Sequence, residues 1–282
     1  MAIDGLSKNL MEVKPHGTRQ FPFAAYEEIF LDGSRNFFKA HWHTEYEIDY
    51  VVEGKICVCV DHQTFVLHKG EAIFINSNQI HSLKTDEKQA RIYAFVFSPK
   101  LFFSSEESVF SKYLERLVLP TYRLTGPLDF DLLYHTFKNA KANYEWQILA
   151  CLVPLFLEIF EGHPYIPVNQ EPNKDIVLVK KIMIYLEEHF QDKITLSKVS
   201  KEVGVCKTEI CRIFKEQTTF TIMDFLNEVR IEKSLYLLKQ GEMTITEIAQ
   251  SVGFNASSYY AQVFKKMIGV SPKTYLFKQK NI

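Results

Sequence analysis

The hydrophobic pattern of the first third of the chain has the short period of β-strands. Between Phe21 and Phe97, short runs rich in Val, Ile, Phe and Tyr are separated by turn signals such as Glu53-Gly54 and Lys69-Gly70. Within residues 55–60 strict alternation places three β-branched side chains on one face. We therefore expect a small β-barrel or jelly roll, preceded by a loose arm over residues 1–20.

After Pro99 the apolar period lengthens toward that of a helix. We expect one or two short helices within 104–117 and a helical hairpin formed by 130–142 and 144–160. The second helix of the hairpin is apolar almost all round, so it needs partners on more than one side. One partner can be the barrel. The other is a second subunit, or else the helix is simply buried within its own chain.

Residues 161–174 contain three prolines and few strong helix or strand formers, which indicates a linker. Beyond them residues 175–190 resume an amphipathic helical pattern, and the rest of the chain keeps it. The expected organisation is an N-terminal domain over 1–163, a linker over 164–174 and a C-terminal domain over 175–282.

The C-terminal domain contains the same pattern twice. Sliding 195–226 onto 244–276 brings Gly204 onto Gly253 and aligns the apolar positions on both sides. Each copy reads as a short helix, a tight turn at the glycine and a second helix, which is the pattern of a helix-turn-helix. Between the copies, 222–239 predicts one connecting helix. A rigid connector would suit two recognition helices in major-groove faces about 34 Å apart along the duplex.

The second helix of each unit offers its outward positions to DNA. These are Lys207, Thr208, Cys211, Arg212 and Lys215 in the first unit and Ser257, Ser258, Gln262, Lys265 and Lys266 in the second. Arg212 can donate two hydrogen bonds to guanine, and Gln262 can pair with adenine. The lysines are suited to phosphates, which give affinity without sequence information. A helical bundle that binds no nucleic acid is the alternative for this doubled motif.

A family resemblance covers more than a third of the chain. Residues 175–278 resemble the DNA-binding domain of AraC/XylS-type transcriptional regulators; the matching positions are Arg230-Ile231, Ile248-Ala249, Val252-Gly253-Phe254, Phe264-Lys265-Lys266, Gly269 and Ser271-Pro272-Lys273-Thr274-Tyr275. The resemblance implies base contacts at Thr208, Cys211, Arg212, Ser257, Ser258 and Gln262. The chain departs from the family at Thr219, where Gly is usual, and at Ser234, where Ala is common. We therefore expect the first unit to dock less tightly.

The β-rich domain resembles a cupin through the spacing of its polar residues. The first cupin motif reads His41-x-His43-x₃-Glu47-x₆-Gly54, and a second motif runs from Gly70 through Asn76 to His81. The second motif is degraded, because Asn76 stands where Pro is common in the family and Asn78 where Gly is. By strand parity His41, His43 and Glu47 point to one side, where the barrel can add His81. Three imidazoles and a carboxylate suit Zn²⁺, Mn²⁺, Fe²⁺ or Ni²⁺. The alternative is that these side chains bind a polar effector or hydrogen-bond within the barrel.

Composition and charge narrow the classes of protein. The 282 residues carry a net charge of −1, but residues 175–282 hold 16 basic against 12 acidic side chains, and residues 1–174 hold 17 against 22. This mild asymmetry favours DNA contact by the C-terminal domain. Five scattered cysteines without a CxxC pair indicate neither a disulfide framework nor a zinc finger. There is no signal-peptide pattern, and the longest apolar run is about half a membrane span, so we expect a cytoplasmic protein without a membrane partner.

The leading hypothesis is a two-domain α+β transcription regulator. It has a cupin-like β-barrel with a helical hairpin, followed by an all-α domain with two helix-turn-helix motifs. We expect it to bind double-stranded DNA, a small effector such as a sugar, and a second copy through the hairpin near 130–160. No cofactor is required, although a divalent transition metal could occupy the cupin site. The resemblance implies RNA polymerase as a partner and activation more often than repression.

Two alternatives from other classes remain open. The first is a metal-dependent cupin enzyme, such as an isomerase or dioxygenase, that uses the C-terminal domain as a tether. It would need an acid or base beyond the metal ligands, and the sequence offers no assignable one. The second is a dimeric DNA-binding protein whose barrel senses nothing. We expect a non-enzymatic regulator.

Overall fold

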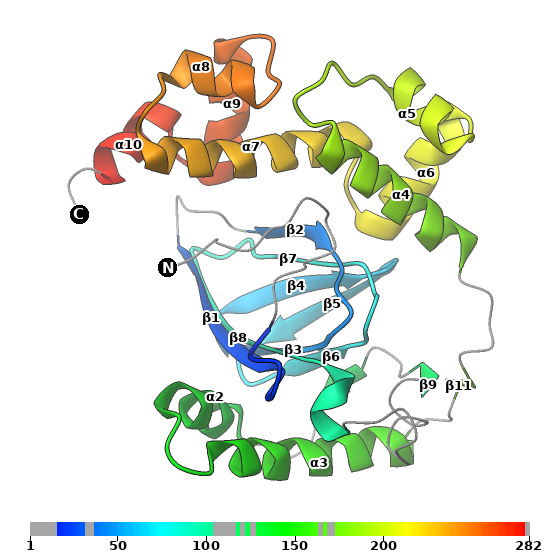
Figure 1. Cartoon of the computed structure of the whole chain (residues 1–282), viewed down its shortest axis with the longest axis vertical. Coiled ribbons are helices and arrows are strands. Elements are labelled where there is room, and N and C mark those ends of the chain that lie inside the picture. Colours follow the sequence, from blue (N-terminus) through cyan, green and yellow to red (C-terminus); the bar gives the residue numbers. More distant parts are fainter. Residues whose placement is uncertain are drawn as a thin grey trace.

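A computed structural model describes residues 16–31, 37–103, 117–118, 122–124, 128–162, 166–167 and 173–279. The described elements form layers (Figure 1): the helices α4 to α10 lie on one side, two facing β-sheets lie in the middle, and the helices α2 and α3 lie on the other side. Each sheet therefore has one face toward the other sheet and one face toward helices. This layering confirms the predicted two-domain α+β fold.

The barrel consists of two antiparallel sheets. The five-stranded sheet has the order β1 (Phe23–Leu31), β8 (Gln89–Phe97), β3 (Tyr46–Glu53), β6 (Ala72–Ile75) and β10 (Tyr122–Leu124). The four-stranded sheet has the order β2 (Phe37–His41), β7 (His81–Lys84), β4 (Lys55–Val60) and β5 (Gln63–His68). Alternate side chains, among them Ile56, Val58 and Val60 as expected, fill the space between the sheets.

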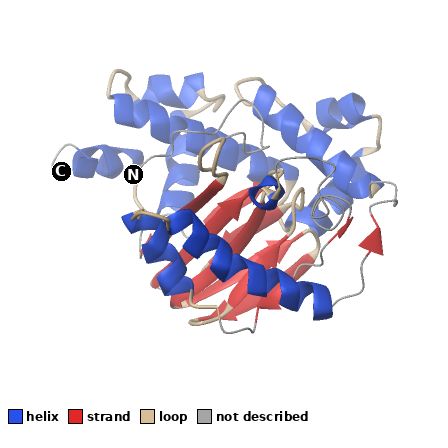
Figure 2. Cartoon of the chain, turned by 60° about the horizontal axis from the view of Figure 1, so that its bottom comes forward, coloured by secondary structure: helices blue, strands red, loops and turns tan. Residues whose placement is uncertain are grey.

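The helical hairpin covers the outer face of the five-stranded sheet. It is formed by α2 (Phe130–Asn139) and α3 (Tyr144–Gly162), which lie across the strands in Figure 2. Every second side chain of the strands points away from the barrel interior and toward the hairpin. Tyr46 and Phe97 are two of these, and they pack against Phe156 of α3. The side of α3 that does not pack against the sheet is also apolar, and Trp146 and Leu157 are exposed there.

The C-terminal domain contains seven described helices. They are α4 (Lys174–Glu188), α5 (Leu196–Val203), α6 (Lys207–Thr218), α7 (Ile222–Gln240), α8 (Ile245–Ser251), α9 (Ser257–Ile268) and α10 (Pro272–Gln279). The repeat found in the sequence is visible in the caps, because Thr195 and Thr244 each accept a backbone hydrogen bond at the start of α5 and α8. Gly204 and Gly253 follow these helices with φ of 73° and 90°, as the tight turns require.

The outer face of the four-stranded sheet is covered by the first helix-turn-helix unit. Ala40, Trp42 and Ile80 of the barrel share one buried cluster with residues of α4, α6 and α7. Trp42 therefore packs on the side opposite to the neighbouring histidines. The barrel therefore has helices on both outer faces, one set from its own domain and one from the DNA-binding domain.

Some expectations require correction. Within the arm predicted to be loose over residues 1–20, the structure describes residues 16–20, and His16 is buried there. The predicted linker contains the short strand β11 (Ile166–Pro167), which pairs with β9 (Leu117–Val118). The helices expected within 104–117 fall almost entirely outside the described residues. No helix in the described parts of the chain is long and apolar enough to span a bilayer.

Candidate metal centre and nucleic-acid interface

The four candidate ligands meet inside the barrel. His41 ends β2, His43 follows it, Glu47 lies on β3 and His81 begins β7. Each offers one ligand atom, and these atoms lie within 4.8 Å of one another. Oε2 of Glu47 is 2.8 Å from Nε2 of His43 and 3.0 Å from Nε2 of His81. The spacing of the first cupin motif and the pairing of β2 with β7 thus bring together the residues predicted from the sequence.

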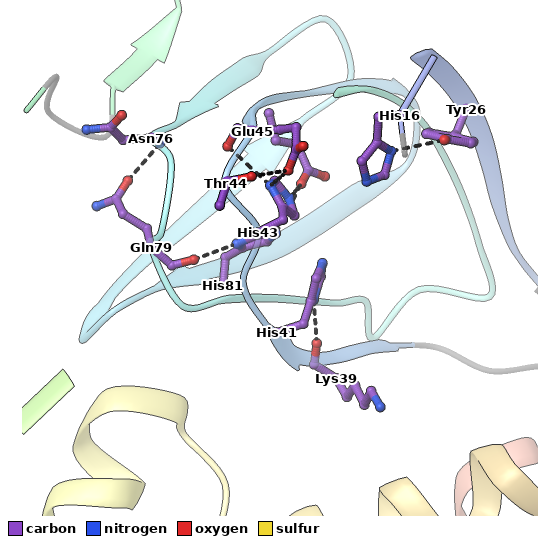
Figure 3. A network of polar contacts seen from close by, with 11 residues as sticks. His16, Tyr26, Lys39, His41, His43, Thr44, Glu45, Asn76, Gln79 and His81 are labelled. Atoms are coloured by element: carbon purple, nitrogen blue, oxygen red, sulfur yellow. Dashed lines mark hydrogen bonds and ion pairs between the residues drawn. The ribbon is translucent and has the colours of Figure 1, made fainter. Parts of the chain in front are cut away.

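Backbone carbonyls orient the three imidazoles. Nδ1 of His41 lies 2.9 Å from the oxygen of Lys39, Nδ1 of His43 lies 3.2 Å from the oxygen of Glu45, and Nδ1 of His81 lies 3.0 Å from the oxygen of Gln79 (Figure 3). A carbonyl can only accept, so each Nδ1 donates its proton. Metal-binding histidines are typically held in this way, with the other ring nitrogen available to the ion. The donor set and its orientation therefore fit a divalent transition metal.

The electrostatics of the cluster centre on Glu47. Burial raises the pKa of this carboxyl, but the neighbouring His81 and His43 outweigh burial and hold it well below its usual range. Burial, together with repulsion from His81, lowers the pKa of His41 well below its usual value. Glu47 is thus held ionised and His41 neutral, which is the protonation state that a metal ion requires of these two ligands.

Sequence reasoning missed two neighbours of this cluster. His16 comes from the arm, stacks at a tilt 5.8 Å from the His43 ring, and shares a 3.0 Å hydrogen bond with the Tyr26 hydroxyl. Asp49 lies two residues after Glu47 on β3, so parity could have placed it in the barrel. It is fully buried, and burial together with the Glu47 charge raises the pKa of its carboxyl well above the usual value.

The turn before His81 explains the degraded second motif. Asn78 occupies the position where the family has Gly, and it adopts φ of 63°, which Asn tolerates better than most residues. Asp61 holds the next residues, since its carboxylate accepts from the Ile80 backbone and from the Gln79 amide. The turn therefore keeps the conformation that positions His81 even though the glycine is missing.

The recognition helix of the first unit, α6, exposes most of its predicted contacts. Lys207, Thr208, Arg212 and Lys215 are exposed, whereas Cys211 is half-buried and packs against the core of the unit. The DNA contact of Cys211 stays a prediction, and its partial burial follows from its position beside the buried stripe of the helix. Glu209 and Glu216 pair with the Arg212 guanidinium at 3.3 and 2.7 Å.

The recognition helix of the second unit, α9, exposes all of its predicted contacts, namely Ser257, Ser258, Gln262, Lys265 and Lys266. Tyr259 is also exposed on this helix, and Asn227 of α7 donates a 3.1 Å hydrogen bond to its hydroxyl. Sequence reasoning missed Tyr259 because an aromatic next to the buried Tyr260 resembles a core position.

Two polar residues of α7 fix the second unit against the first. Arg230 donates to the carbonyls of Phe190 and Asp192 at 2.8 and 2.9 Å, and its guanidinium lies over the Phe254 ring. Ser234, where the family commonly has Ala, accepts a 3.1 Å hydrogen bond from the buried Tyr260 of α9. The departure at Ser234 therefore adds a contact to the second recognition helix.

Comparisons with known proteins agree with both halves of the structure. A family model described as a helix-turn-helix domain matches residues 199–277, and one described as a cupin domain matches residues 28–97. The uncharacterized HTH-type transcriptional regulator YdeC of Bacillus subtilis (strain 168) is 25% identical over 281 residues, which cover 96% of this chain and 97% of YdeC. The probable transcriptional regulator LumQ of Photobacterium leiognathi is 23% identical over 247 residues, covering 88% and 94%.

A solved structure shares the fold across both domains. A crystal structure of an apo ToxT variant from Vibrio cholerae superposes with a TM-score of 0.50 at 16% identity, covering 93% of this chain and 98% of ToxT. The resemblance found in the sequence is confirmed by the two domain matches and by the relatives named as transcriptional regulators, while the ToxT structure supports the fold alone. The chain resembles the AraC/XylS-type transcriptional regulators in combining a cupin domain with a C-terminal helix-turn-helix domain.

Proposed function

We propose that the protein is a ligand-responsive transcription regulator that reads two successive major grooves. The observation that carries this proposal is the pair of exposed recognition helices on one connecting helix. α7 has 19 residues, which corresponds to a length of about 28 Å. That length is close to the separation of about 34 Å between successive major-groove faces. Relatives named as transcriptional regulators over nearly the whole chain support the same conclusion.

In the proposed complex α6 carries the stronger base readout. Arg212 can give two hydrogen bonds to guanine, while α9 offers Gln262 and two serines. The lysines on α9 would contact phosphates and set the register. To reach the base, Arg212 would have to leave Glu209 and Glu216. This costs little free energy because both ion pairs are exposed.

The test begins with DNA selected from a random library by the intact protein. Arg212→Ala is expected to raise Kd for the selected site by about 5- to 150-fold and to relax preference at one base position. The matched control is Arg123→Ala, which removes an exposed arginine of the barrel that pairs with Glu71 at 2.7 Å. Equal affinities of the two variants, with an unchanged base preference, would refute the assignment of Arg212 to base readout.

We infer that the effector site is the cluster of His41, His43, Glu47 and His81, and that it takes a divalent first-row metal ion. The support is the proximity of the four ligand atoms and the hydrogen bonds that orient each imidazole. A bound ion would supply a fixed positive charge inside the barrel, to which a small polar molecule such as a sugar could attach. The proposed role is sensing, with activation of transcription through RNA polymerase as the expected output.

Metal binding can be tested on purified full-length protein. Addition of Zn²⁺, Mn²⁺, Fe²⁺ or Ni²⁺ is expected to raise the Tm, because an ion that binds only the folded state stabilises it. His81→Ala should abolish the shift, whereas His62→Ala, an exposed histidine outside the cluster, should retain it. A shift of the same size in His81→Ala would place the metal elsewhere.

We also propose a homodimer formed by the hairpin. On α3, Trp146 is 74% exposed and Leu157 is 55% exposed, and Val153 lies between them on the same face. An apolar stripe of this kind on an otherwise well-packed hairpin is typical of an interface. A second copy would present the same stripe, as a two-fold contact requires.

A further inference from the structure

The candidate metal site and the interface between the two domains use the same short backbone segments. Around the end of β2, His41 and His43 point into the barrel, while Ala40 and Trp42, on either side of His41, pack against the DNA-binding domain. At the start of β7, His81 points into the barrel, and the preceding Ile80 packs against the DNA-binding domain. A single layer of backbone therefore separates the four-residue cluster from the first helix-turn-helix unit.

Lys39 connects this layer to two helices of the DNA-binding domain. Its ammonium group is 3.1 Å from Oε1 of Glu187 on α4 and 2.5 Å from Oε2 of Glu232 on α7. All three side chains are buried. The backbone oxygen of Lys39 is the acceptor for Nδ1 of His41. In Figure 3 the side chain of Lys39 extends away from the imidazoles, so one residue contacts the cluster with its backbone and the other domain with its side chain.

A second connection reaches the turn before His81. Lys180 of α4 donates a 2.7 Å hydrogen bond to the backbone oxygen of Asn78 and lies 5.2 Å from the centre of the Trp42 ring. The next residue, Gln79, provides the carbonyl that orients His81. Two of the three imidazoles are thus held by backbone that also contacts the DNA-binding domain.

We propose that the buried group formed by Lys39, Glu187 and Glu232 is a latch that docks the DNA-binding domain on the barrel and couples the four-residue cluster to DNA affinity. This inference rests on the proposed function of that cluster as a sensor. A ligand that reorients His41 must move the carbonyl of Lys39, and the attached ammonium group then changes its fit between the two carboxylates. A buried charge that loses its partner is costly, so a small displacement can shift the docking equilibrium.

Docking is measured through Trp42. The chain has two tryptophans, so Trp146→Phe leaves the interface residue Trp42 as the single fluorophore. In this background Lys39→Met is expected to raise acrylamide quenching of Trp42 from that of a buried indole toward that of an exposed one. Lys55→Met is the matched control, since Lys55 pairs at 2.9 Å with the exposed Asp86 of the same barrel.

A compensated variant separates loss of the latch from misfolding. Lys39→Met combined with Glu187→Gln and Glu232→Gln leaves no unpaired charge in the interface, so low quenching should return. Quenching of Lys39→Met that equals the control overturns the latch. So does high quenching that persists in the compensated variant, because the effect would then come from damaged packing.

Coupling is measured with Zn²⁺ as the probe and with DNA selected by the wild-type protein. The ratio of DNA Kd with and without Zn²⁺ is expected to differ from one by about fivefold or more in wild type, and to fall to about one in Lys39→Met. Lys55→Met should keep the wild-type ratio. A wild-type ratio of one despite bound Zn²⁺, or an unchanged ratio in Lys39→Met, overturns the coupling.

The failure of the proposed sensor is distinguishable from the failure of the latch. If the wild-type protein binds no Zn²⁺, the metal assignment of the cluster is refuted, and the Trp42 measurement still decides whether the group formed by Lys39, Glu187 and Glu232 docks the domains. If Zn²⁺ binds and the Trp42 measurement shows no opening in Lys39→Met, the sensor stands and the latch is refuted.

Discussion

The junction between the two helix-turn-helix units depends on Arg230, and replacing it by Met should destabilise the C-terminal domain strongly. The side chain is almost fully buried and donates to the carbonyls of Phe190 and Asp192. Hydrogen bonds from a charged donor contribute about 1.5 to 3 kcal/mol each. The contact with Phe254 adds about 0.5 to 2 kcal/mol. These contributions are not additive, so we expect a loss of about 3 to 5 kcal/mol.

The assay is urea unfolding followed by the helical circular dichroism signal. Arg91→Met is the matched control, because Arg91 forms a 3.1 Å ion pair with Glu27 on the barrel surface, with exposed fractions of 37% and 30%. An exposed pair contributes about 0 to 1 kcal/mol. Arg230→Lys should be intermediate, since an ammonium group cannot reproduce the planar two-bond geometry.

DNA binding provides a second readout of the same perturbation. Gly253, in the turn of the second unit, packs so closely that an added Cβ would lie 2.4 Å from the carbonyl oxygen of Phe190 and 3.0 Å from the Arg230 guanidinium. Arg230 therefore fixes the turn that precedes α9. Its loss should weaken binding to a two-groove site more than binding to a site that keeps only the α6 half. A destabilisation of Arg230→Met below about 1 kcal/mol, equal to that of the surface control, would refute the reasoning.

Three further predictions concern strain, protonation and assembly. Thr219 is the C-cap of α6 and has φ of 65°, and the second unit has Gly269 at the same position. Thr219→Gly should therefore raise the free energy of unfolding by about 1 kcal/mol in urea titrations. An unchanged midpoint would contradict this. Because the pKa of Asp49 is raised on folding, the folded state binds the proton more tightly and stability falls as pH rises from the unfolded pKa of about 4 through the folded pKa. Asp49→Asn should remove that decline in Tm measured across the acidic to neutral range; an unaltered pH profile would show that Asp49 does not cause it. Leu157→Glu should convert the proposed dimer to monomer in sedimentation velocity, whereas Lys138→Glu on α2 should not. A dimer that persists in Leu157→Glu would exclude this face.

The sequence predicted those features that depend on local spacing. The repeat aligned Gly204 with Gly253 and gave both tight turns, because a sharp reversal after a helix favours a glycine with positive φ. The cupin spacing of His41, His43 and Glu47 gave three candidate ligands, because side chains two apart on extended backbone share a side.

Features that depend on contacts between distant segments were not predictable in the same way. Lys39 lies 148 positions before Glu187, and no local period indicates that they meet. His16 stands in a segment without periodicity, so its burial beside His43 could not be read from pattern. The half-burial of Cys211 was not predictable either, since periodicity alone can assign a small side chain at the edge of a helical stripe to either side.

The helix α7 contacts both helix-turn-helix cores and the barrel. Its first half supplies Phe225 and Val229 to the core of the first unit, and its second half supplies Leu235 and Leu238 to the core of the second. Between them Glu232 carries the contact to Lys39 of the barrel. Because packed helices move as rigid bodies, a displacement of α7 at this point would carry both recognition helices together. If the proposed sensor acts on Glu232, the presentation of both units to DNA would change at once, so the footprints of both half-sites should change together in Lys39→Met.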